Sequence, residues 1–135
     1  MGNFLYTCVQ LVHNFGAVTV VGSPAVALWL GHDHKATQYQ LAWLMVLGWA
    51  AQGASGAGFG ITSIYLKGQI PDVTGVALAA LLVKIACALT GFILAAVYLR
   101  YGSGWSSRNQ SLLRQIMLGL AVTALSAAAF LRWYL

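Results

Sequence analysis

Acidic side chains are almost missing from this sequence. Asp and Glu contribute only two of its 135 residues, and all charged residues together make up 7%. Soluble domains carry about 25% charged residues, so this composition cannot cover a water-facing surface. Two carboxylates, Asp33 and Asp72, also leave no acidic pairs of the kind that hydrolytic enzymes use.

Cysteine and clustered basic residues are scarce as well. Cys8 and Cys87 each lie in an apolar run and match no disulfide or zinc-binding spacing. The net charge is +5, but the seven basic residues are spread along the chain instead of being gathered on one face. We therefore exclude a nucleic-acid partner and expect the basic residues to flank membrane spans.

Long apolar runs fill the chain instead, with 60% hydrophobic residues and a mean hydropathy of +0.78. Four runs are long enough to cross a bilayer, and they predict spans at about 4–30, 39–66, 73–99 and 111–131. Pro24 is expected to kink or end the first helix. No cleaved signal peptide is expected, because the first run lacks a basic leader and is too long. The sequence predicts an all-α integral membrane protein: one domain, 1–135, forming a four-transmembrane-helix, up-down bundle.

Residues near the ends of the runs predict how the protein is oriented in the membrane. Aromatic side chains suited to the headgroup layer recur there, including Trp29, Tyr65, Tyr98 and Trp133. Basic residues favour the side that carries the first and third loops: Lys35, Arg100, Arg108 and Arg114, against Lys67 and Arg132 opposite. By the positive-inside rule, both termini are predicted on the periplasmic side of a bacterial inner membrane.

Small residues line one face of the second predicted span. Gly48, Gln52, Gly56 and Gly60 recur every four residues and therefore stack along the helix. In lipid, such a face lets a neighbouring backbone approach closely, so we predict helix packing at Gly48, Gly56 and Gly60. A flat cofactor lying against the same face is the alternative.

Two polar residues stand deep inside predicted spans, where an ionisable group indicates a functional site. His13 could be neutral and bonded to another helix, or could ligate a haem iron or a metal ion. Lys84 has no Asp or Glu in any span to neutralise it. Backbone carbonyls, a haem propionate, a quinone oxygen or another subunit's carboxylate could each serve as its partner.

Helix geometry places these residues at similar depths. At 1.5 Å per residue, His13 lies about 13 Å and Lys84 about 17 Å from the same membrane surface, with Gln52 about a turn deeper. We predict that His13, Lys84 and Gln52 face one interior pocket, because polar groups exposed separately to lipid would lack partners.

The first loop carries a second cluster, His32-Asp33-His34. Two imidazoles and a carboxylate could hold copper or zinc, so His32 and His34 are candidate metal ligands beside His13. A solvated turn at the membrane surface is the alternative.

The spans also carry a resemblance to a known group of proteins. The first reads LVHNFGAVTVVGSPAVAL and the third LLVKIACAL. A His early in span one, a Gly about nine residues later and a Lys in span three resemble the small four-helix superfamily that includes copper-resistance D (CopD) and HemJ-type proteins. The likeness covers about residues 9–95 and implies a haem- or copper-associated redox protein, with His13, Gly22 and Lys84 in the family's key positions. Val20-Val21 replaces the family's Trp, and the Arg of HemJ-type enzymes is missing, which argues against porphyrinogen oxidation.

Two functions follow. The first is a haem b- or metal-associated component of a membrane redox system, in which His13 is a ligand and Lys84 an electrostatic partner; copper is the alternative to haem b. The second is a non-catalytic accessory subunit of a larger membrane complex, without a cofactor, whose glycine-rich face packs against other membrane subunits. In neither case do we expect an enzyme on its own.

The predicted orientation can be tested at Ser106 in the third loop. In a variant with Cys8 and Cys87 replaced, a Ser106→Cys side chain should resist a membrane-impermeant thiol reagent in intact cells and react after permeabilisation. Labelling in intact cells would reverse the orientation.

Overall fold

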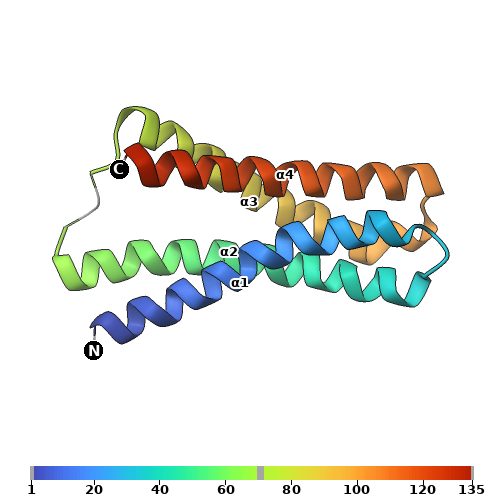
Figure 1. Ribbon diagram of the computed structural model, residues 1–135, viewed down its shortest axis with the longest axis horizontal. Coiled ribbons are helices and arrows are strands. Elements are labelled where there is room, and N and C mark those ends of the chain that lie inside the picture. Colours follow the sequence, from blue (N-terminus) through green and yellow to red (C-terminus); the bar gives the residue numbers. More distant parts are fainter. Residues whose placement is uncertain (1, 70–71, 135) are drawn as a thin grey trace.

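The computed structural model describes residues 2–69 and 72–134, and within them the chain forms a helical bundle. Its α-helices are α1 (Gly2–Leu30), α2 (Lys35–Lys67), α3 (Gly75–Tyr101) and α4 (Ser107–Tyr134), with a short 3-10 turn, η1 (Gly102–Gly104), after α3. Successive helices run in opposite directions, and each packs against its neighbours in the sequence (Figure 1). The predicted all-α fold is confirmed. Pro71, in the predicted second linker, lies outside the described residues.

Helix composition indicates an integral membrane protein. By length and composition, α1, α3 together with η1, and α4 are able to cross a membrane. α2 is 33 residues long but less clearly apolar. Its buried residues include four polar side chains, Gln38, Gln52, Ser55 and Ser63. Some of the polar side chains of α2 therefore face the other helices.

The helices extend beyond the predicted spans by up to about one turn. α2 begins at Lys35 and α4 at Ser107, inside segments predicted to be loops. The α4 start is capped by Ser106, whose Oγ accepts the Asn109 N–H at 3.3 Å. Such turns lie outside the hydrocarbon, so hydropathy does not detect them.

Pro24 does not end α1, which continues to Leu30. A proline removes only one backbone donor, and the neighbouring Ser23 hydroxyl donates to the Thr19 carbonyl at 2.6 Å. The helix ends instead at Gly31, whose φ of 73° is left-handed. The expected helix end at Pro24 is therefore wrong, and the alternative, a kink at Pro24, stays a prediction.

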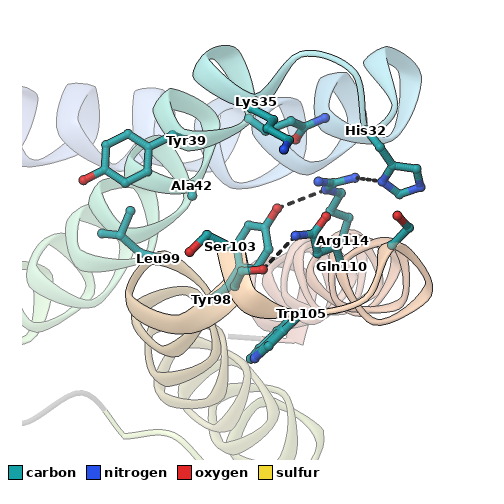
Figure 2. A pocket seen from close by; sticks show the side chains of 13 residues that line it. His32, Lys35, Tyr39, Ala42, Tyr98, Leu99, Ser103, Trp105, Gln110 and Arg114 are labelled. Carbon is teal, nitrogen blue, oxygen red and sulfur yellow. Dashed lines mark hydrogen bonds between the residues drawn. The ribbon is translucent and has the colours of Figure 1, made fainter.

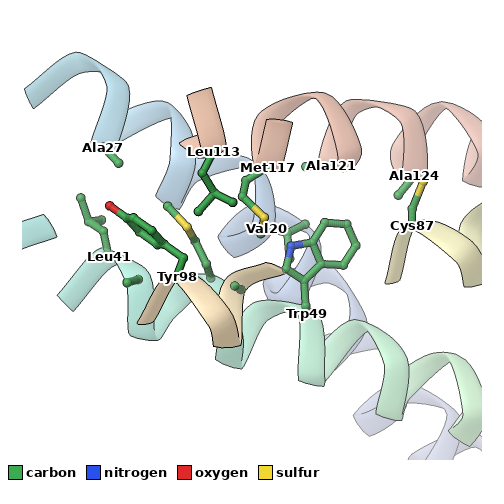
Figure 3. Packing of buried hydrophobic residues seen from close by; sticks show 13 residues of the cluster. Val20, Ala27, Leu41, Trp49, Cys87, Tyr98, Leu113, Met117, Ala121 and Ala124 are labelled. Carbon is green, nitrogen blue, oxygen red and sulfur yellow. The ribbon is translucent and has the colours of Figure 1, made fainter. Parts of the chain in front are cut away.

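A large aromatic side chain fills the middle of the bundle. Trp49 is 1% exposed and packs in a cluster with Val20, Met117 and Ala121 (Figure 3). Its ring lies so close to α3 that a Cβ at Gly91 would overlap it. Glycine at position 91 thus lets α2 and α3 approach each other around the indole.

Within this chain, the predicted glycine packing is found at Gly48 but not at Gly56 or Gly60, whose packing against another subunit stays a prediction. A Cβ at Gly48 would lie 2.9 Å from Val20 Cγ1 and 3.0 Å from Thr19 Cγ2, so α1 crosses α2 closely there. A Cβ at Gly56 or Gly60 would meet nothing within 4 Å. All three lie near one face, but each four-residue step advances about 40° around the helix. Gly56 and Gly60 therefore rotate away from α1, which contacts Ser55 and Gly58 instead.

These contacts predict that leucine will destabilise the protein at position 48 but not at position 56. Gly48→Leu should destabilise the protein in detergent by about 1–3 kcal/mol or more, because the side chain must displace Val20 and Thr19. Gly56→Leu, on the same helix, should leave the thermal unfolding midpoint nearly unchanged. Equal losses at both positions would contradict the close α1–α2 crossing at Gly48.

Candidate functional site

The candidate site lies where α1, α2 and α3 meet, about halfway along the bundle. His13 Nε2 of α1 lies 3.1 Å from Lys84 Nζ of α3, and His13 Nδ1 lies 2.7 Å from Ser55 Oγ of α2. Residues separated by 71 positions in the sequence are thus in direct contact. The prediction that His13 and Lys84 face one interior site is confirmed.

The direction of each hydrogen bond follows from the groups available. The Ser55 hydroxyl has one proton, which is directed to the Ala51 carbonyl at 2.6 Å. Ser55 Oγ therefore accepts from His13 Nδ1–H. The lone pair on His13 Nε2 then accepts from Lys84 Nζ. The network assigns a neutral imidazole with its proton on Nδ1.

Gln52 lies beside this network and, as predicted, lines the same cavity as His13 and Lys84. Its Nε2 donates to the His13 carbonyl at 2.6 Å, which fastens α2 to the α1 backbone. Gly16 makes this approach possible, because a Cβ there would lie 2.8 Å from the same nitrogen. Gln52 therefore holds His13 in place, while its role toward a cofactor stays a prediction.

Aromatic rings surround the outer part of the site. Phe59 packs edge-on against the His13 imidazole, with ring centroids 5.4 Å apart. Tyr6 packs against Phe59 and lies 3.2 Å from Ser63 Oγ through its hydroxyl. These contacts limit the rotation of the imidazole and keep Nε2 directed at Lys84.

A cavity of about 180 Å³ adjoins the two nitrogens. It is lined by His13, Lys84, Gln52 and Trp49 and, on the α4 side, by small residues that include Ala121 and Ala124. The Trp49 Nε1–H is buried and has no hydrogen-bond partner among the described residues. Lys84 has three N–H groups, of which His13 accepts one. The cavity thus offers spare donors to a ligand that carries acceptor oxygens.

The geometry allows a test of the two cofactors that the resemblance implies. An imidazole and a deprotonated amine can each donate a lone pair to a metal ion, and two bonds of about 2.0–2.1 Å at the tetrahedral angle would separate the nitrogens by about 3.3 Å. The observed 3.1 Å is close to that separation. Pockets for drug-sized ligands measure about 300–1,000 Å³, so the 180 Å³ cavity does not fit a haem macrocycle as the helices stand. The two nitrogens thus fit a metal ion.

The first-loop histidines lie elsewhere. His32 and His34 are exposed, and His32 Nδ1 faces Arg114 Nη1 at 3.4 Å. Over residues 2–69 and 72–134, the structure brings together no group of three or more His, Cys, Asp or Glu side chains that could hold a metal ion. The predicted metal site at His32 and His34 gains no third ligand from the fold.

Sequence reasoning missed Ser55 and Trp49. Ser55 lies one turn after Gln52 and shares its face, which is the signal that could have identified it. Trp49 gave no signal, because a tryptophan in an apolar run is as compatible with the lipid surface as with the core.

No protein-family model, curated protein or solved structure matches this chain. No relative therefore assigns a role to His13 or Lys84. The resemblance to the CopD and HemJ superfamily stays a prediction.

Ser55→Ala tests the network with a matched control. The substitution leaves the His13 Nδ1–H without its acceptor and should lower the free energy of unfolding by about 1–3 kcal/mol. Ser126→Ala removes an exposed hydroxyl that bonds only the Val122 carbonyl of its own helix and should cost much less. The measurement is thermal unfolding in detergent, and equal effects would show that the His13–Ser55 bond contributes nothing.

Proposed function

We propose that this protein crosses the membrane four times and is a component of a membrane redox system. It would hold a metal ion at His13 and Lys84, or the iron of haem b at His13 with Lys84 as an electrostatic partner. The observation that carries the proposal is the direct contact of two nitrogen donors, at 3.1 Å, in the interior of a bundle. Both residues come from helices apolar enough to cross a membrane.

The cost of placing these two groups in lipid supports a functional role. Polar and ionisable residues inside a membrane are expensive and mark ligand, ion or proton sites. Here a lysine is held against a neutral imidazole, although the chain supplies no carboxylate in any helix to balance a charge. Binding a metal cation would use the lone pairs of both nitrogens and displace the Lys84 proton. A monovalent ion such as Cu⁺ would then replace one positive charge instead of adding to it.

Copper and haem would each require a different rearrangement of the chain. A copper ion needs loss of the Lys84 proton and only a small movement of the Lys84 amine. Haem needs the α4 face at Ala121 and Ala124 to move away from α1, which would enlarge the cavity. In that case the spare Lys84 and Trp49 donors are available for the propionates.

An absorption spectrum and metal analysis of natively purified protein test the proposal. A Soret band would identify haem, and about one copper per chain without such a band would identify copper. His13→Ala should abolish either signal, because it removes a ligand. His34→Ala, an exposed histidine of the first loop, should leave the signal unchanged. Protein free of both haem and metal would end this proposal.

A second candidate function rests on the open glycine face of α2. Gly53, Gly56 and Gly60 share one helix face, and a Cβ at each would meet nothing within 4 Å. A helix from another subunit could pack closely there. The protein would then be an accessory subunit without a cofactor. Co-purification with a larger membrane complex, lost in Gly56→Leu, would favour this function.

A further inference from the structure

A second polar site occupies the end of the bundle that carries the first and third loops. Its central residue is Arg114 of α4, which is only 2% exposed. The guanidinium Nε donates to the Tyr98 hydroxyl at 3.1 Å, and Nη1 donates to His32 Nδ1 at 3.4 Å (Figure 2). A guanidinium has five N–H groups, so these two contacts leave most of its donors for another partner.

The chain provides no carboxylate to balance this charge. Its two acidic side chains, Asp33 and Asp72, are both exposed. Within the described residues, Arg114 donates to the Tyr98 hydroxyl and to His32 Nδ1. Because His32 Nδ1 accepts this hydrogen bond, it carries no proton, and neither partner is an anion. A buried charge is costly unless it is paired and hydrogen-bonded. Arg114 is therefore a buried cation without an anionic partner among the described residues.

A cavity of about 430 Å³ opens beside Arg114. This volume is within the range of ligand pockets. Lys35 also lines the cavity and adds a second cation. The first turns of α2 and α4 begin here, and neither contains an acidic residue. The last turns of α1 and α3 end on the same side, so the helix dipoles largely offset each other. The positive charge of the cavity therefore comes from Arg114 and Lys35.

Uncharged polar side chains form the rest of the cavity wall beside Arg114, and they restrict which ligands the cavity can bind. Hydroxyl groups come from Tyr39, Ser103 and Ser107. Gln110 directs its Nε2 to the Gly102 carbonyl at 2.7 Å, so that nitrogen is engaged. Gln38 Nε2 donates to the Ala27 and Gly31 carbonyls. The Gln38 Oε1 atom is buried and accepts no hydrogen bond from the described residues. An anion that also carries an O–H group would satisfy both Arg114 and Gln38 Oε1.

We propose that the Arg114 pocket binds a phosphate oxyanion, supplied by an anionic lipid headgroup or by free hydrogen phosphate. Guanidinium groups bind phosphate oxygens through two parallel hydrogen bonds, and Lys35 adds a second charge. Both sources carry the required hydroxyl: a glycerol headgroup has its own, and hydrogen phosphate has a P–O–H. Arg114 lies about two turns into α4, near the level of the headgroups.

Binding to protein in uncharged detergent distinguishes the two sources. The first probe is ³²P-labelled inorganic phosphate in equilibrium dialysis. The second is dihexanoyl phosphatidylglycerol in native mass spectrometry, with zwitterionic dihexanoyl phosphatidylcholine as the control lipid. We expect saturable binding of one phosphate or one phosphatidylglycerol per chain. Arg114→Gln should weaken it by about tenfold or more, because a charge-assisted hydrogen bond contributes about 1.5–3 kcal/mol.

A pair of exposed positions keeps the test informative if Arg114→Gln fails to fold. Lys35 and Arg108 are both exposed at this end, but only Lys35 lines the pocket. Lys35→Gln should weaken binding several-fold, whereas Arg108→Gln should leave it unchanged. Equal effects of these two variants would indicate diffuse attraction to a basic surface and overturn the proposal. Absence of saturable binding by both probes, or wild-type affinity in a folded Arg114→Gln protein, would also overturn it.

Discussion

In a low-dielectric interior, every polar group must find its partner within the protein, and this requirement organises the bundle. Four polar side chains of α2 meet α1 along its length. Gln38 donates to the last carbonyls of α1, Gln52 to the His13 carbonyl, Ser55 pairs with the His13 ring and Ser63 with Tyr6. α1 and α2 are therefore joined by hydrogen bonds at several levels.

α3 and α4 pack against each other mainly through small side chains. Their buried positions are mostly small residues, including Ala77, Ala80 and Ala95 on α3 and Ala121, Ala124 and Ala127 on α4. Small side chains let two helices pack closely by van der Waals contact, and the hydrogen bonds of Arg114 to Tyr98 and of Gln110 to Gly102 join them only at one end. Trp49 then links the two pairs, since it arises from α2 and packs against Gly91 of α3.

Much of this fold and part of the site could be predicted from the sequence. The helices follow from four apolar runs, and the meeting of His13 and Lys84 follows from their similar depths in parallel spans. What could not be predicted is how the helices approach one another. The four-residue spacing from Gly48 rotates Gly56 away from α1, whose contact with α2 continues at Ser55, Gly58 and Ser63. Tyr98 has the composition of a headgroup anchor but is buried against Arg114.

The two polar sites are separated by an apolar layer. Gln38, Ala42 and Arg114 line the end cavity, and Trp49, Gln52 and Lys84 line the inner one. Met45 lies between these groups on α2, and Met117 between Arg114 and Ala121 on α4.

Both methionines are fully buried and pack in one cluster with Trp49 (Figure 3). Among the described residues of α2 and α4, the buried side chains between the two cavities are apolar. An ion or proton passing between the sites would lose its hydration in this layer, which therefore acts as a barrier to charge between the two depths of the bundle.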